Sequence, residues 1–488
     1  MDSIAMKNSV SSADFNLSDD RPEEACGVFG IYGPGKDVSR LTYFGLHALQ
    51  HRGQESAGIA VADGESTVVF KDMGLVPQVF DERKLASLQG HIAVGHVRYS
   101  TTGSTRWENS QPIHKVYGSG TLALVHNGNL LNSRELRQEL LDNGRRFRST
   151  SDTEVIAGMV AKAAGDDIAG AVASTMGRLR GAYSILIMTE SELIAIRDPY
   201  GVRPLALGRL EDSWVVASET CALDIVGAVY ERDVNPGEMI VIDADGLHAR
   251  QVVQPEKPSL CIFEFIYFAR PDSRIYGQSL YVARRRMGME LAKEAPIEAD
   301  LVIGLPDSGT PAAIGYAQEA GIPFGEGLIK NRYVGRTFIQ PDQTLRQLGV
   351  KLKLNPLAEV VRGKRLIIVD DSIVRGNTSR QIVGILKEAG AAEVHVRISS
   401  PPVIHPCFYG IDTDSPAQLL AATKTIAQIG EFIGADSMAY LSFEGLVRAT
   451  GCGHEDFCLA CFDGVYPIPL SEEQELGKLI LESEIVKR

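Results

Sequence analysis

The chain has 488 residues, 44% of them hydrophobic and 23% charged, a composition typical of a globular protein with two or three domains. Lys and Arg number 49 and Asp and Glu number 62, so the net charge of −13 disfavours nucleic acid or an anionic membrane as the main partner. No apolar run reaches the roughly 18 residues of a membrane span, and seven cysteines without a secretory signal predict a reducing compartment, the cytoplasm.

Residues 1–25 form a polar leader, MDSIAMKNSVSSADFNLSDDRPEEA, rich in Ser, Asp and Asn. It lacks the apolar stretch of a secretory signal and is too acidic for an organelle transit peptide. Two interpretations stay open, a disordered tail and a propeptide whose removal exposes Cys26. The second requires Cys26 to be a nucleophile, because a chain-terminal cysteine carries its own base, an α-amino group with a pKa of about 7.7–8.0.

From residue 26 to about residue 250, short β runs separated by Gly predict stacked sheets with helices on the outside. Two amphipathic segments, residues 40–53 and 152–165, predict helices between the strands. Beyond residues 251–275, buried apolar runs alternate with helical segments, which is typical of a parallel sheet.

Two predicted strands of this second half end in polar loops. The stretch LIIVDDSIVRGNTSRQIVGILKEAG predicts a buried strand over residues 366–369, with Asp370 and Asp371 at its C-terminal end, and a helix that residues 376–379 open and that runs to Gly390. Ligands of open α/β sheets bind at this edge, where helix N–H groups suit a phosphate and paired carboxylates suit vicinal hydroxyls or Mg²⁺. The alternative, two acids that only cap a helix, would bury them without need. A second strand ends at Gly304 before a loop with Asp307, Ser308, Gly309 and Thr310, which suits pyrophosphate or is an ordinary turn.

VDDSIVRGNTS resembles the 5-phosphoribosyl 1-diphosphate loop of type I phosphoribosyltransferases, and PDSGT resembles their pyrophosphate loop. The resemblance implies that Asp370 and Asp371 bind the ribose diol and Mg²⁺, with Ser308 as the third protein ligand of the metal. It also implies a 5-phosphate site formed by Arg375, Gly376, Asn377, Thr378 and Ser379. KNRYVGRTFIQP resembles the mobile basic loop that closes over pyrophosphate, although a solvated charged loop is the alternative; its basic residues are Lys330, Arg332 and Arg336.

Six stretches of the first half, CGVFGIYG, LHALQHRGQESAGIA, GHVRYSTTG, ALVHNGNLLN, STSDTEV and RDPYGVRPLALG, together resemble the class II glutamine amidotransferase domain of the Ntn-hydrolase superfamily. The resemblance implies that Cys26 is the nucleophile and that Arg98 and Asp152 bind the α-carboxylate and α-ammonium of glutamine, the first through a bidentate fork. Asn127 and the Gly128 N–H are the implied oxyanion hole. Three histidines are expected to be structural, namely His51, His96 and His126. No role is assigned to Glu55 and Tyr99.

The two halves in this order resemble the amidophosphoribosyltransferase family, in its iron–sulfur, propeptide-bearing branch. The resemblance implies a propeptide at 1–25, an αββα Ntn glutaminase domain at 26–255 and a type I phosphoribosyltransferase domain with a parallel sheet and an iron–sulfur cluster at 256–488. The implied reaction uses ammonia from glutamine to convert 5-phospho-α-D-ribose 1-diphosphate into 5-phosphoribosylamine, the first committed step of de novo purine synthesis. A homotetramer inhibited by purine nucleotides is expected on the same basis.

Two other functions share part of these features. Another class II amidotransferase would carry a different second half, and a non-catalytic sensor of the ribosyl diphosphate would have no use for Cys26.

The remaining cysteines allow two metal sites. CGHEDFCLAC has spacing that suits zinc held by Cys452, His454, Cys458 and Cys461. The family resemblance instead implies a 4Fe-4S cluster, structural because the reaction moves no electrons. Its implied ligands are Cys261, Cys407, Cys458 and Cys461, which leaves Cys221 and Cys452 spare.

Overall fold

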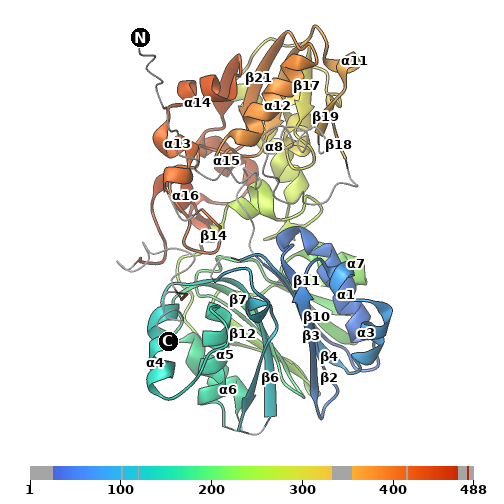
Figure 1. The fold of residues 1–488 in the computed structure, drawn as a ribbon, viewed down its shortest axis with the longest axis vertical. Helices are drawn as coiled ribbons and strands as arrows, with labels where there is room; N and C mark the ends of the chain where they lie inside the picture. The colour runs from blue at the N-terminus through green and yellow to red at the C-terminus, as the bar shows by residue number, and fades with distance from the viewer. Residues whose placement is uncertain are drawn as a thin grey trace, which may run out of the picture.

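The computed structural model describes residues 26–100, 103–118, 120–165, 167–331, 354–413, 416–470 and 481–482. Two bodies are stacked along the long axis of the molecule, the first built from residues 26–251 and the second carrying the parallel sheet (Figure 1). The predicted propeptide and two residues of the predicted basic loop, Arg332 and Arg336, lie outside the described residues. In the described part of the chain, no helix is long and apolar enough to cross a membrane.

The first body contains two antiparallel sheets. The seven-stranded sheet has the order β11-β9-β10-β1-β4-β2-β3. Its strands are β1 (Gly27–Tyr32), β2 (Ser56–Ala62), β3 (Thr67–Met73), β4 (Ile92–Arg98), β9 (Ala206–Leu210), β10 (Ser213–Ala217) and β11 (Val229–Asp233). The six-stranded sheet has the order β13-β12-β8-β7-β6-β5. Its strands are β5 (Ile113–Tyr117), β6 (Gly120–Leu130), β7 (Gly181–Met188), β8 (Leu193–Arg197), β12 (Glu238–Asp243) and β13 (Gly246–Gln251).

The central strands β1, β2, β4, β7 and β8 are buried at every position because both faces of each sheet are covered, whereas the edge strands β3, β5, β11 and β13 are partly exposed. In β1, Val28 and Tyr32 pack between the two sheets, whereas Phe29 and Ile31 pack against the outer helices. The helices on the seven-stranded sheet are α1 (Val38–Ala48), α2 (Val76–Val79), α3 (Glu82–Ser87) and α7 (Thr220–Val226). Those on the six-stranded sheet are α4 (Ser133–Asp142), α5 (Asp152–Ala163) and α6 (Ile168–Met176). The predicted αββα sandwich is confirmed.

The two predicted helices of this body exist with shifted ends. The first begins at Val38, where the Asp37 side chain caps it by accepting from the Arg40 N–H. It ends at Ala48, and a 3₁₀ turn, η1 (Gln50–Arg52), continues the chain toward β2. The second, α5, is capped by Ser151 and matches its prediction closely.

The second body is built on a parallel sheet of order β17-β20-β21-β22, as predicted. Its strands are β17 (Leu301–Gly304), β20 (Arg365–Asp370), β21 (Glu393–Ile398) and β22 (Ser437–Tyr440). One face packs on α8 (Leu280–Glu294), α9 (Thr310–Ala320) and α15 (Phe443–Thr450). The other face packs on α12 (Asn377–Glu388) and α14 (Ile426–Ile433).

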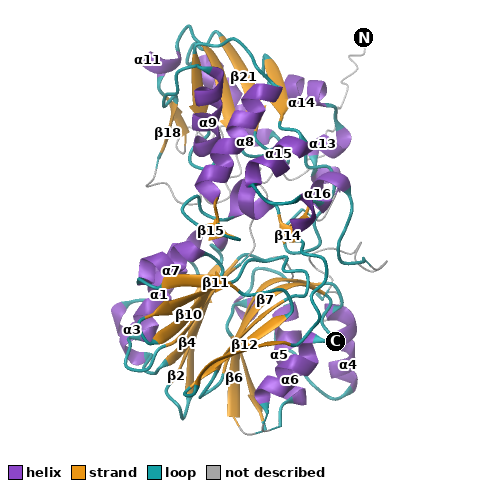
Figure 2. Cartoon of the chain, turned by 180° about the vertical axis from the view of Figure 1, so that it is seen from behind, coloured by secondary structure: helices purple, strands orange, loops and turns teal. Residues whose placement is uncertain are grey.

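Short elements complete the second body, and several of them lie between the two bodies (Figure 2). They are β14 (Leu260–Cys261), the π-helical turn η3 (Glu264–Phe268), β15 (Arg274–Ile275), β16 (Gln278–Ser279), β18 (Leu328–Lys330), β19 (Leu354–Pro356), α11 (Ala358–Val361), α13 (Leu420–Thr423), β23 (Phe457–Cys458) and α16 (Ala460–Asp463). The predicted domain boundary at residues 255 and 256 falls in the loop between β13 and β14.

His96 on β4 makes the stability of the first body depend on pH. It has no exposed surface, and burial lowers its pKa to about 3. An unfolded histidine has a pKa of about 6.5, so between pH 7 and pH 5 the unfolded chain gains a proton that the folded chain does not. The stabilisation is therefore present above pH 6.5 and is lost as the pH falls, by about 2 kcal/mol between pH 7 and pH 5.

We expect His96→Asn to remove this contribution, so that stability falls less between pH 7 and pH 5 than in the wild type. Both tryptophans, Trp107 and Trp214, belong to the sandwich, so urea denaturation followed by tryptophan fluorescence reports on this body. The exposed His248 is the matched control, and His248→Asn should keep the wild-type pH dependence. An unchanged slope in His96→Asn would contradict the assignment.

Candidate active sites

Cys26 lies where the ends of three strands meet. β1 pairs antiparallel with β4, which brings Cys26 beside Arg98 at the end of β4. β2 pairs with the other edge of β4, so Glu55, which precedes β2, lies at the same edge. The thiol is 5% exposed and donates to the carbonyl oxygen of Tyr99, with Sγ and O 3.2 Å apart.

The Cys26 thiol is neutral in this environment. Burial raises its pKa to about 12; Arg98 opposes the rise, and Glu55 and Asp152 add to it. A neutral thiol is a poor nucleophile and needs a base to take its proton. In the full-length chain the nitrogen of Cys26 is joined to Ala25 as an amide and is not basic.

Arg98 presents a buried guanidinium next to the thiol. It is 2% exposed, and its Nη1 lies 3.5 Å from a carboxylate oxygen of Glu55. The same side chain donates to the carbonyl oxygens of Gly103 and Ser104, each at 3.4 Å. Glu55, unassigned from the sequence, thus contacts Arg98 and also accepts from the Ser100 hydroxyl. A guanidinium held in this way suits a ligand carboxylate.

Asp152, at the start of α5, supplies the opposite charge. Its carboxylate accepts from the Leu130 N–H at 3.0 Å and lies 3.7 Å from Nδ1 of His126. Burial alone would raise its pKa, but His126 and the backbone N–H groups of Leu130 and Thr153 outweigh burial and lower the pKa. Cys26 thus lies within the electrostatic range of a buried cation and a buried anion, which fits a ligand with a carboxylate and an ammonium group.

β6, which packs against β1 and β4, carries Asn127 and Gly128. The Asn127 amide is fully buried, and neither its nitrogen nor its oxygen has a hydrogen-bond partner among the described residues. An unpaired buried polar group costs about 1–3 kcal/mol, which marks it as a candidate ligand contact. At Gly128 φ is 148°, and a Cβ there would collide with the carbonyl oxygen of Ala182. The Asn127 amide therefore suits the predicted oxyanion hole, and the position of Gly128 requires glycine.

The second candidate site lies at the C-terminal edge of the parallel sheet. β17 pairs with β20 so that Gly304 lies opposite Val369, and the two following loops meet. A Cβ on Gly309 would lie 2.5 Å from the carbonyl oxygen of Val369, so this close approach needs glycine. The structure thereby brings the loop with Asp307, Ser308 and Thr310 beside Asp370 and Asp371.

The loop after β20 enters α12 through Gly376, which has a left-handed φ of 80°. Helix α12 then begins at Asn377, as predicted, so the N–H groups of residues 377–379 belong to its first turn, the end of a helix that suits an anion. Arg375 contacts Gln418 at 2.6 Å, and Lys330 on β18 forms an ion pair with Asp307 at 2.8 Å.

The donors of the predicted magnesium site are chemically suitable. Asp370 and Asp371 are 5% and 1% exposed, and the Asp371 N–H donates to Asp370 at 2.9 Å. Two carboxylates and the nearby Ser308 hydroxyl are hard oxygen donors, the class that Mg²⁺ prefers.

The four predicted cluster cysteines lie in one neighbourhood. Cys261 on β14 pairs in register with Cys458 on β23. The Cys461 carbonyl accepts hydrogen bonds from the N–H groups of Ile404 and His405. Cys407 follows two residues later and therefore lies near Cys461. Burial, followed by the neighbouring Cys261, raises the pKa of Cys458 and of Cys461 well above the ordinary value.

The two residues that only the local zinc alternative would use, Cys452 and His454, have surroundings of their own. Burial and Asp456 raise the pKa of Cys452, and the His454 ring packs against Phe443 at 5.2 Å. In the described residues no three His, Cys, Asp or Glu side chains are grouped closely enough to hold a single metal ion.

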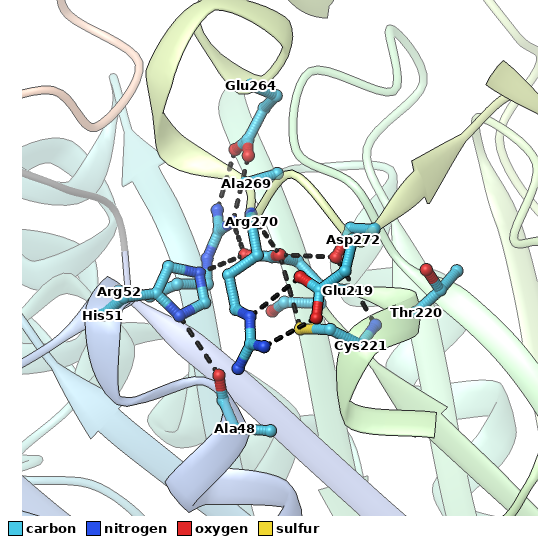
Figure 3. A network of polar contacts seen from close by, with 12 residues as sticks. Ala48, His51, Arg52, Glu219, Thr220, Cys221, Glu264, Ala269, Arg270 and Asp272 are labelled. Carbon is cyan, nitrogen blue, oxygen red and sulfur yellow. Dashed lines mark hydrogen bonds and ion pairs between the residues drawn. The ribbon is translucent and has the colours of Figure 1, made fainter. Parts of the chain in front are cut away.

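Sequence reasoning missed a buried ionic network between the two bodies. Arg52, Arg203, Glu219 and Glu264 have side chains with no exposed surface, and Arg52 contacts both carboxylates (Figure 3). His51, expected to be structural, lies 2.7 Å from Glu219. A glutamate inside the apolar run LCIFEFIYF was the available signal, because an isolated buried charge needs a partner.

Comparison with known proteins covers both bodies. A family model of the glutamine amidotransferase domain matches residues 96–224, and one of the phosphoribosyl transferase domain matches residues 277–399. The amidophosphoribosyltransferase of Synechococcus elongatus is 57% identical over 470 residues, which are 95% of this chain and 95% of the relative. That of Mycobacterium tuberculosis is 56% identical, over 94% of this chain and 90% of the relative.

Two solved structures resemble the whole molecule. The glutamine phosphoribosylpyrophosphate amidotransferase from B. subtilis complexed with ADP and GMP is 49% identical, covers 92% of this chain and 98% of its own, and has a TM-score of 0.87. A structure described as the allosteric regulatory enzyme of purine biosynthesis is also 49% identical, covers 93% and 98%, and has a TM-score of 0.89. The chain belongs to the amidophosphoribosyltransferase family.

Proposed function

We propose that the chain catalyses the first committed step of de novo purine synthesis, in which glutamine and 5-phospho-α-D-ribose 1-diphosphate yield 5-phosphoribosylamine, glutamate and pyrophosphate. One observation carries the proposal. A single chain combines a buried cysteine between a cation and an anion with a phosphate-type loop at the edge of a parallel sheet. Neither another class II amidotransferase nor a ribosyl diphosphate sensor needs both.

In the glutaminase half, Arg98 binds the α-carboxylate of glutamine and Asp152 binds the α-ammonium. Cys26 Sγ attacks the amide carbon, and the oxyanion that forms accepts hydrogen bonds from the Asn127 amide and the Gly128 N–H. The terminal amine of Cys26, free once the leader is removed, takes the thiol proton and delivers it to the amide nitrogen of the tetrahedral intermediate, which leaves as ammonia when its bond to carbon breaks. Water then hydrolyses the γ-glutamyl thioester and releases glutamate.

In the transferase half, the first turn of α12 and residues 375–379 bind the 5-phosphate, and the loop with Asp307 to Thr310 binds the pyrophosphate. Asp370 and Asp371 orient the ribose hydroxyls, and these carboxylates with Ser308 are the proposed holders of Mg²⁺. The metal, when bound, offsets the negative charge that the pyrophosphate carries as it leaves. Lys330, with Arg332 and Arg336, completes the cationic surroundings of the pyrophosphate. Ammonia attacks C1 while the bond from C1 to the pyrophosphate oxygen breaks.

Further properties are proposed on family grounds. Cys261, Cys407, Cys458 and Cys461 hold a structural 4Fe-4S cluster. The chain assembles as a homotetramer, and purine nucleotides inhibit it, in line with the relative that was solved with ADP and GMP. The cytoplasm is the proposed location, because seven cysteines with no disulfide among the described residues suit a reducing compartment.

Cys26→Ala should separate the two reactions. We expect glutamine-dependent synthesis to fall at least 1,000-fold, on the order of losing a nucleophile, because no thioester can form. Synthesis from added ammonia should persist, while Asp371→Asn should reduce both rates. Pyrophosphate release with glutamine or ammonium chloride measures both, and glutamine use retained in Cys26→Ala would show that the nucleophile is another residue.

Removal of the leader should switch on the glutaminase. We expect protein that begins at Cys26 to hydrolyse glutamine and protein that retains residues 1–25 to be inactive, since an amide nitrogen cannot take the thiol proton. Intact-mass measurement and N-terminal sequencing of active and inactive fractions test this. Full activity in protein with its leader intact would rule the propeptide out.

Cys458→Ser should remove the cluster. Anaerobically purified wild type should be brown, with about four irons and four sulfides per chain, and the variant should lose both and unfold at a lower temperature. Cys452→Ser is the matched control and should keep its iron. Colourless, active wild-type protein with one zinc per chain would favour the local zinc site instead.

A further inference from the structure

Arg52 joins the nucleophile's main chain to the transferase domain. Its Nε donates to the carbonyl oxygen of Cys26 at 3.2 Å. Its two other nitrogens bind the Glu264 carboxylate at both oxygens, at 3.0 and 2.7 Å, and Nη1 also binds Glu219 at 2.6 Å. Figure 3 shows the guanidinium reaching Glu264 across the boundary between the two bodies. Each of the three guanidinium nitrogens thus donates to at least one acceptor. The acceptors are the Cys26 carbonyl oxygen and Glu219 in the glutaminase domain, and Glu264 in the transferase domain.

Glu264 also connects to the strand that carries the candidate oxyanion donors. Nη1 of Arg203 lies 3.4 Å from its carboxylate, and the same guanidinium donates to the Tyr409 carbonyl at 2.9 and 3.2 Å. The next residue, Gly410, has φ of 106°, and a Cβ there would lie 3.3 Å from the carbonyl carbon of Gly128. The backbone at residues 409–410 therefore rests directly on the Gly128 main chain.

The second carboxylate of the network, that of Glu219, holds the far end of the transferase segment at residues 264–273. Glu219, at the start of α7, accepts from the Arg270 N–H and from the Ser273 hydroxyl, both at 2.8 Å. Residues 264–273 are thus held at two points by the glutaminase domain. A shift of residues 264–273 relative to the glutaminase domain would therefore break these hydrogen bonds and ion pairs, or would move their partners in the glutaminase domain with it.

The network is poorly suited to serve stability alone. Two guanidinium groups and two carboxylates are fully removed from water, and such buried ion pairs are often no more stabilising than apolar side chains of the same volume. Unlike apolar contacts, these ion pairs are directional, because a planar guanidinium group donates to its partners in a fixed geometry. The atoms that it fixes are the main chain of Cys26 and the loop on Gly128.

We propose that Glu264 of the transferase domain is a positioning residue for glutamine hydrolysis: through Arg52 it holds the Cys26 main chain, and through Arg203 and residues 409–410 it holds the Gly128 strand. The inference rests on the proposed function. The glutaminase reaction then depends on a docked transferase domain, so that ammonia is made only where an acceptor site is in place. Glu264 touches no substrate and takes no part in phosphoribosyl transfer.

The test compares glutamine- and ammonia-dependent synthesis in processed Glu264→Gln protein that begins at Cys26 and carries both domains; this substitution keeps the shape of the side chain and removes its charge. We expect kcat with glutamine to fall about 10- to 100-fold, the order that a displacement of about 1 Å causes. The KM for glutamine should change less than about threefold because Arg98 and Asp152 are untouched, and the rate with ammonia should stay within about twofold. Arg52→Lys, which keeps the charge but not the fork, should show the same split.

A double-mutant cycle shows whether the two residues act together. If Glu264 works through Arg52, Glu264→Gln combined with Arg52→Lys should lose little more than either single variant, whereas multiplied losses would overturn the proposal. Arg178→Gln, an exposed arginine paired with Glu139, is the control for loss of an ion pair and should behave as wild type. Equal loss of both rates in both variants would assign the network a purely structural role and also overturn the proposal. The proposed function itself fails only if wild-type protein makes no phosphoribosylamine, so the two failures are distinct.

Discussion

Ammonia released into water at neutral pH takes up a proton and is no longer a nucleophile, so a site that makes it and a site that uses it must be held together. In this chain the contact between the two bodies includes specific hydrogen bonds and ion pairs as well as apolar packing. Asn129, which follows the candidate oxyanion residues, donates to the Phe408 carbonyl oxygen at 2.9 Å. The hydroxyl of Tyr99, which follows Arg98, donates to the Asp412 carboxylate at 3.5 Å. Residues adjacent to the glutaminase site thus contact the transferase domain directly.

The candidate cluster lies close to the same interface. Cys407 precedes Phe408 and Tyr409, and its sulfur accepts from the Tyr409 N–H at 3.4 Å. Burial raises the pKa of Cys261 to about 12, and Arg203, which opposes that rise, also binds Glu264. A cluster at this point would fix residues 407–412, which rest on the glutaminase domain. Its proposed structural role is then local, because it would stabilise the loop that contacts Asn129, Tyr99 and Gly128 beside the first site.

Much of this architecture could be predicted from short-range patterns. Gly304 and Asp370 end their strands as expected, and α12 begins at Asn377, because buried apolar runs and the residues that end them are local signals. The α1 helix ended earlier than its apolar pattern suggested, since residues 50–52 form a 3₁₀ turn that directs Arg52 inward. The Arg52–Glu264 pair was beyond sequence reasoning because its members are 212 residues apart and follow no period.

The burial of Cys26 limits how its proton can leave. Burial raises the pKa of the thiol to about 12, well above the value near 8 of a terminal amine in water, so the thiol holds its proton before attack. Proton transfer to the amine can then accompany attack on the amide carbon. Such a step tolerates little misplacement of the Cys26 main chain, which gives a reason for anchoring its carbonyl to Arg52.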